Sequence, residues 1–155
     1  IDRSRGLGDV YKRQILSGME TKEKEALEFY GRNLGLTFQI ADDTLDYNSE
    51  LKLFGKKIGN DFYEGKITLP IILLFQKADN AEKERLRKIF LSNNREESDL
   101  KYTLSLIKKY DIINKCYQKA HHYINLASNS LSVFNECEEK NILENLTSFS
   151  LSRDF

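Results

Sequence analysis

Apolar residues recur every three or four positions along most of the chain, which is the period of helices packed by one face. From about Lys22 to Tyr47 the pattern predicts one long helix with Thr21 as its N-cap. Gly31 and Gly35 fall inside it, and we expect them to permit close packing of a neighbouring helix. Other predicted helices are the end of an upstream helix at Ile15–Gly18, helices capped by Thr68 and by Asp79 or Asn80, and the segments Leu100–Tyr110, Ile112–Phe134 and Lys140–Ser152.

No strand pattern alternates with these helices, and no repeat is visible, so the parallel α/β classes are excluded. The predicted fold class is all-α, a helical bundle. The helical period stops from Asn48 to Lys66, and this segment is predicted to be a loop rich in glycine and lysine. Glycine lets the backbone approach a ligand, and lysine offers charge to phosphate oxygens. This loop is not a Walker A motif, because Asn60 stands where the first glycine belongs and Ile67 follows the lysine.

The end of the long predicted helix carries a cluster of acidic residues. Asp42 and Asp46 lie one turn apart on the same face, and Gln39 precedes them there. Because the surrounding residues are apolar, unpaired carboxylates would be costly to bury, and a hard cation such as Mg²⁺ suits these oxygen donors. The alternative is a surface cluster that only solvates the helix. An EF-hand is excluded, since Thr44 and Tyr47 occupy the third and sixth loop positions.

Composition narrows the classes of partner. Lys and Arg number 24 and Asp and Glu number 24, so no global field favours nucleic acid or an anionic membrane. The longest apolar run, Ile67–Phe75, is too short for a transmembrane segment. Cys116 and Cys137 lack partners at zinc spacing, and we interpret them as reduced thiols of a cytoplasmic protein.

Residues 1–14 stand outside the helical pattern. The run from Gly6 to Gln14 resembles a translated adapter tail, so we exclude residues 1–14 from fold reasoning; a native basic arm is the alternative. Because the chain begins with Ile1 rather than Met, we expect it to lack its natural start. Residues 15–155 are the predicted domain.

Three motifs occur in order along this domain. They are Phe38-Gln39-x-x-Asp42-Asp43-x-x-Asp46-Tyr47, Gly55-Lys56-x-x-Gly59-x-Asp61 and Glu64-Gly65-Lys66-x-Thr68-Leu69-Pro70. Together they resemble the trans-polyprenyl diphosphate synthases, and the resemblance covers residues 15–155 as the C-terminal half of such an enzyme. The motifs look most like those of long-chain members such as octaprenyl diphosphate synthase.

The resemblance implies an isoprenoid-synthase-type helical bundle that works as a homodimer. Such an enzyme condenses isopentenyl diphosphate with an allylic diphosphate, using Mg²⁺ held by two Asp-rich motifs. By this resemblance Asp42, Asp43 and Asp46 form the second motif, as catalytic and metal-binding residues. The residues that correspond to diphosphate-binding side chains are Gln39, Lys56 and Lys66, and Asp61 corresponds to a residue that orients a lysine.

The first Asp-rich motif is missing from these residues, so we expect the fragment alone to be inactive. If the parent protein is an enzyme of this kind, the alternative to a long-chain enzyme is a short-chain farnesyl or geranylgeranyl diphosphate synthase. The alternative from a different functional class is that the parent protein is a non-catalytic partner subunit that kept the scaffold. A second Asp-rich cluster upstream would favour the enzyme.

Overall fold

The computed structural model describes residue 18, residues 20–48 and residues 58–152, with side chains omitted at 148 and 150–152. Within these residues every regular element is helical, which confirms the predicted all-α class. The elements are α2 (Thr21–Leu45), α3 (Asn60–Glu64), α4 (Leu69–Lys77), α5 (Asn80–Leu91), α6 (Glu97–Lys109), α7 (Ile112–Ser130), the 3₁₀ helix η2 (Leu131–Val133) and α8 (Glu138–Ser152). None of the helices in this part of the chain is long and apolar enough to cross a bilayer.

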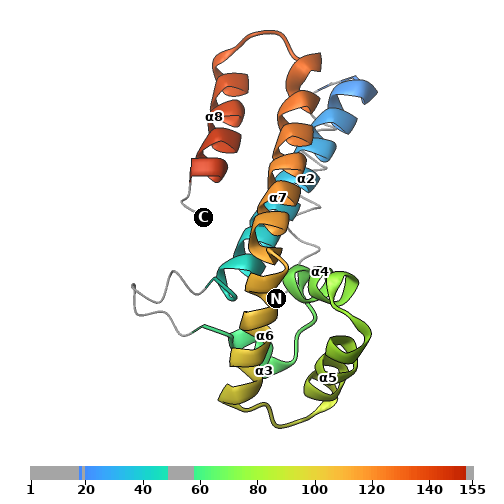
Figure 1. Ribbon diagram of the computed structural model, residues 1–155. Helices are drawn as coiled ribbons and strands as arrows, with labels where there is room; N and C mark the ends of the chain where they lie inside the picture. Colours follow the sequence, from blue (N-terminus) through green and yellow to red (C-terminus); the bar gives the residue numbers. More distant parts are fainter. Residues whose placement is uncertain (1–17, 19, 49–57, 153–155) are drawn as a thin grey trace.

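The long helices α2 and α7 lie side by side, and α8 returns next to α7 (Figure 1). The helices α3, α4, α5 and α6 lie together beyond the C-terminal end of α2. One core joins α2, α7 and η2 through Leu34, Ile124 and Leu131 respectively. The Tyr30 hydroxyl donates to the Leu143 carbonyl at 2.8 Å and so ties α8 to α2.

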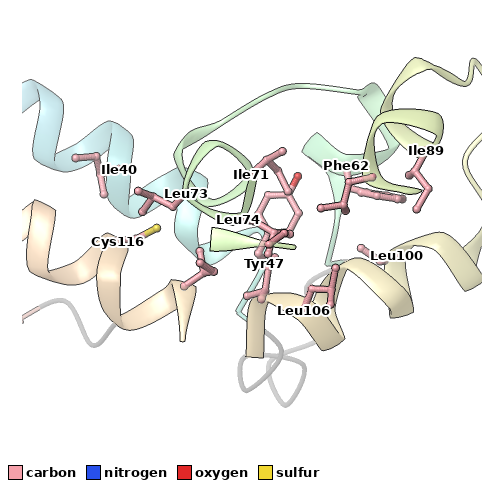
Figure 2. Close-up of a cluster of buried hydrophobic side chains, with 14 of the residues drawn as sticks. Ile40, Tyr47, Phe62, Ile71, Leu73, Leu74, Ile89, Leu100, Leu106 and Cys116 are labelled. Atoms are coloured by element: carbon pink, nitrogen blue, oxygen red, sulfur yellow. The ribbon is translucent and has the colours of Figure 1, made fainter. Parts of the chain in front are cut away.

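A second core holds the short helices together. Figure 2 shows Tyr47, Phe62, Ile71 and Leu74 among its members, all essentially without exposed surface. Burying each of these side chains contributes about 1.5–3 kcal/mol relative to leaving it in water. This core therefore fixes the end of α2 against α3 and α4.

Most predicted helix limits agree with the structure to within a few residues. The helix α5 begins after Asp79, whose carboxylate accepts the Glu82 N–H at 2.9 Å, so that predicted cap is confirmed. Thr68 is the residue before α4, also as predicted. The N-cap of α2 was placed wrongly: it is Glu20 rather than Thr21, because the Glu23 carboxylate accepts the Glu20 N–H at 3.0 Å.

The predicted loop Asn48–Lys66 contains a helix that its sequence pattern does not reveal. The helix α3 has only five residues, too few to show a helical period. Gly59 and Gly65 bracket it with φ of 87° and 73°, a backbone conformation that favours glycine. Its one fully buried residue, Phe62, packs edge-on against Phe90 with ring centroids 5.5 Å apart. Tertiary packing, rather than local propensity, forms this helix.

The close helix packing expected at Gly31 and Gly35 is not found in the described part of the chain. A Cβ added at Gly31 or Gly35 would meet no atom of the described residues within 4 Å, so the expected close helix packing is absent there. Both glycines are exposed. The predicted tail at residues 1–14, most of the helix end at Ile15–Gly18, and Lys56 lie outside the described residues.

Candidate functional site

Where α2 ends, a hollow of about 730 Å³ opens between α2, α3 and the start of α4. We call it the acidic hollow. The three predicted acids, Asp42, Asp43 and Asp46, line it. Two of the predicted diphosphate-binding residues, Gln39 and Lys66, line it as well, although they are 27 positions apart in the sequence. Its lining residues are Gln39, Asp42, Asp43, Asp46, Asn60, Asp61, Glu64, Lys66, Ile67, Thr68, Leu69 and Ile72.

Asp46 holds the beginning of α3. Its Oδ1 accepts the backbone N–H of Asn60 at 3.1 Å, and its Oδ2 accepts that of Asp61 at 2.9 Å. Burial raises the pKa of Asp46 above its ordinary value, and these backbone hydrogen bonds act in the opposite direction. Both carboxylate oxygens are thus hydrogen-bonded, and Asp46, which directly follows α2, caps the N-terminus of α3.

Asp43 faces the beginning of α4. Gln39 Nε2 donates to its Oδ1 at 2.7 Å, and the backbone N–H of Leu69 is a further donor. Burial is the main influence on its carboxyl, and it raises the pKa. The start of a nine-residue helix also presents the positive end of a helix dipole to this carboxylate. Gln39, predicted to bind diphosphate, is engaged here with a neighbouring acid of its own helix.

Asp42 differs from the other two acids. It is exposed, and its carboxylate makes no hydrogen bond or ion pair with the part of the chain that the structure describes. The expectation that the acids project into an apolar interior is therefore wrong for Asp42 and holds only in part for Asp43 and Asp46, which are half-buried. Of the apolar residues near the cluster in the sequence, Ile40 is buried and joins the core that contains Leu73 of α4 and Cys116 of α7.

Lys66 brings positive charge to the acidic hollow. Its Nζ lies 2.7 Å from Glu64 Oε2 and 2.9 Å from Asp61 Oδ1, and its side chain is 55% exposed. The hydrogen bonds to Glu64 and Asp61 raise the pKa of Lys66, so it stays an ammonium ion at neutral pH. The predicted pairing of Asp61 with a lysine is confirmed. The ion pair between Glu64 and Lys66 was not predicted. Glu64 ends a short helix that the sequence pattern does not reveal, so nothing in the sequence indicates where its side chain points.

The chemistry of these donors fits Mg²⁺ that arrives with a phosphate ligand. Among the described residues no three acidic, histidine or cysteine side chains converge on a point as a complete metal centre. Mg²⁺ commonly takes one or two protein carboxylates and fills its remaining positions with water and substrate phosphates. An exposed Asp42, with half-buried Asp43 and Asp46 beside it, meets that requirement, and Lys66 adds an anion-binding group.

Comparison with known proteins gives consistent results. The family model described as polyprenyl synthetase matches residues 10–107. A short chain isoprenyl diphosphate synthase of Methanothermobacter thermautotrophicus is 32% identical over 140 residues, covering 90% of this chain and 42% of that protein. Octaprenyl diphosphate synthase of Escherichia coli is 48% identical over 58 residues, covering 37% of this chain and 18% of that protein.

Solved structures resemble this one over nearly the whole chain. A decaprenyl diphosphate synthase from Rhodobacter capsulatus has a TM-score of 0.78 at 26% identity, covering 92% of this chain and 43% of that one. A polyprenyl synthase from Caulobacter crescentus, complexed with calcium and isoprenyl diphosphate, has a TM-score of 0.76 at 34% identity, covering 89% and 42%. The chain thus spans less than half the length of the curated relatives it matches.

Proposed function

The chain belongs to the polyprenyl synthetase family, and from this membership we propose that its full-length gene product is a prenyltransferase. The reaction is the head-to-tail condensation of isopentenyl diphosphate with an allylic diphosphate, which lengthens the prenyl chain by one unit in each cycle. The observation that carries the proposal is the acidic hollow, which three aspartates and a lysine line together. We propose a long-chain polyprenyl diphosphate as the product.

The residues of the hollow have separate tasks in this proposal. Asp42 is the direct metal ligand, because its carboxylate, unlike those of Asp43 and Asp46, makes no hydrogen bond or ion pair with a described residue. Asp43 and Asp46 act on the metal directly or through water bound to it. Bound Mg²⁺ supplies a Lewis acid that withdraws charge from the diphosphate leaving group. Gln39 and Lys66 hold the diphosphate oxygens. The same task is proposed for Lys56, which lies outside the described residues.

Apolar side chains also line the acidic hollow and suit a hydrocarbon. Ile67 is 53% exposed and Ile72 is 43% exposed, which leaves both side chains open to a ligand. A molecule with a charged head and an apolar tail could contact Lys66 and the acids through its head and these side chains through its tail. A prenyl diphosphate has that character.

The test is a condensation assay with the full-length gene product, isopentenyl diphosphate, a series of allylic starters and Mg²⁺, with products resolved by chromatography and mass spectrometry. We expect elongated products that disappear when EDTA removes the metal. Asp42→Asn should lower kcat by about 100-fold or more, since a metal contributes several kcal/mol to transition-state stabilisation. Glu84→Gln, an acid paired with Arg87 on the surface of α5, is the matched control and should leave kcat unchanged.

The outcome also decides between the alternatives. Relatives named as short-chain and as octaprenyl enzymes both match this chain, so the product length measured in the assay selects one of them. If no starter is elongated at any Mg²⁺ concentration, the enzyme proposal fails and a non-catalytic partner subunit is favoured. We further propose that the protein is a cytoplasmic homodimer, which light scattering of the purified protein and cell fractionation would test.

A further inference from the structure

The helix α3 is held at both ends by charged side chains from distant parts of the chain. A helix begins with unpaired N–H groups and ends with unpaired carbonyls, and five residues are too few for a helix to persist alone. At its start, the Asp46 carboxylate accepts two of the N–H groups. At its end, Arg95 Nη1 donates to the Tyr63 carbonyl at 3.1 Å. An acid at the start and a cation at the end both match the helix dipole.

Arg95 connects α3 to α5 as well. Its Nη2 donates to the Phe90 carbonyl at 2.8 Å, and its Cζ lies 5.8 Å from the centre of the Phe90 ring. The same guanidinium covers Gly65, where an added Cβ would lie 2.8 Å from Arg95 Cζ. Since the planar guanidinium presents several donors in a fixed arrangement, Arg95 fixes the end of α3 in direction as well as position.

The position of Lys66 depends on this end of α3. Gly65 turns the backbone at φ 73°, and its N–H donates to the Phe62 carbonyl at 3.0 Å. The backbone N–H of Lys66 then donates to the Asp61 carbonyl at 2.9 Å, while its Nζ binds the Asp61 carboxylate at 2.9 Å. Both the backbone and the ammonium group of Lys66 are therefore attached to α3.

We infer that Arg95 is a positioning residue for the diphosphate end of the site. It acts through α3 on Lys66, and it does not line the acidic hollow. The inference rests on the proposed function, since it assigns Lys66 to a diphosphate. It adds a residue that none of the three sequence motifs contains, located 29 positions after Lys66 in the loop between α5 and α6.

The experiment measures the affinity of the full-length gene product for inorganic pyrophosphate with Mg²⁺, by calorimetry, together with kcat and KM for condensation. Arg95→Ala should weaken pyrophosphate binding by about tenfold, the lower end of the loss seen when a residue that orients a ligand-binding group is removed. KM for the diphosphate substrates should rise more than kcat falls. Arg95→Lys, which keeps the charge and a single donor group, should recover part of the affinity. Arg87→Ala removes an exposed arginine of α5 and should change nothing.

A double-mutant cycle separates positioning from general stability. If Arg95 acts through Lys66, Arg95→Ala should have little further effect on pyrophosphate affinity in a Lys66→Ala background. An equal loss of affinity in both backgrounds would overturn the inference, as would wild-type affinity in folded Arg95→Ala. All measurements are made below the unfolding temperature found by circular dichroism. If Arg95→Ala does not fold, Arg95→Lys takes its place in the cycle with the same criteria.

Failure of the inference is distinguishable from failure of the proposed function. A wild-type protein that neither binds pyrophosphate with Mg²⁺ nor elongates any starter contradicts the proposed function. A wild-type protein that does both, while the Arg95 variants behave like it, contradicts only the role of Arg95.

Discussion

Replacing Gly65 with alanine should destabilise the protein through two separate effects at the end of α3. The first is backbone strain, because Gly65 has φ 73° and ψ 21° and an L-residue in this left-handed conformation costs roughly 1–2 kcal/mol. The second is a collision, since the new Cβ would lie 2.8 Å from Arg95 Cζ. Moving the guanidinium away would sacrifice at least one of its bonds to the Tyr63 and Phe90 carbonyls, and hydrogen bonds to charged groups contribute about 1.5–3 kcal/mol each.

The two effects together predict a loss of roughly 2.5–5 kcal/mol in the free energy of unfolding. Because a typical protein has about 5–15 kcal/mol in total, Gly65→Ala should still fold but with a clear deficit. Urea denaturation followed by circular dichroism is the assay. With a slope of about 1–3 kcal/mol per molar urea, the midpoint should fall by roughly 1–5 M.

Gly65→Asn is the matched variant that divides the total. Asparagine tolerates the left-handed conformation better than alanine does, but its Cβ meets Arg95 in the same way. It should therefore lose less stability than Gly65→Ala, by about 1 kcal/mol. A free energy of unfolding for Gly65→Ala within about 0.5 kcal/mol of wild type, the range of an ordinary surface substitution, would refute the reasoning.

Three further predictions concern groups outside the acidic hollow. Hydrogen bonds from Lys109 and Tyr110 lower the pKa of Glu82 from 4.5 to about 2, so this carboxylate stabilises the fold above pH 4.5 and the stabilisation is lost as the pH falls toward 2. Unfolding of Glu82→Gln in urea should accordingly depend less on pH between 4.5 and 2 than unfolding of wild type, and identical slopes would contradict the pairing. Burial raises the pKa of Cys116 to about 11, whereas Cys137 is exposed. Iodoacetamide at pH 8 should therefore label only Cys137 in the native protein, as read by mass spectrometry. Rapid labelling of Cys116 in the native protein would disprove its burial. Leu74→Ala empties a fully buried position and should cost about 2–5 kcal/mol in urea denaturation, and a loss below about 1 kcal/mol would show that the core collapses around it.

Local sequence determined the long elements of this protein. Periodicity over a dozen or more residues reports which face of a helix is buried, so α2, α6 and α7 were predictable to within a few residues. Short-range cap chemistry narrowed the start of α5 to Asp79 or Asn80, and the structure selects Asp79; the capping contact spans only three positions. The spacing of Asp42, Asp43 and Asp46 along one helix also placed them together at its end, and the motif string identified the family.

Tertiary structure decided what those acids and their neighbours contact. Nothing in the sequence near Asp46 shows that its carboxylate caps a helix that begins 14 positions later, or that Arg95 closes the other end of that helix. Glu82, in the first turn of α5, binds Lys109 and Tyr110 at the end of α6. A five-residue helix and a paired charge draw their stability from groups far away along the chain, whereas periodicity and caps depend on neighbours within a turn or two. For that reason the sequence alone predicts the long helices and the family, and only the folded chain reveals how the site is held in place.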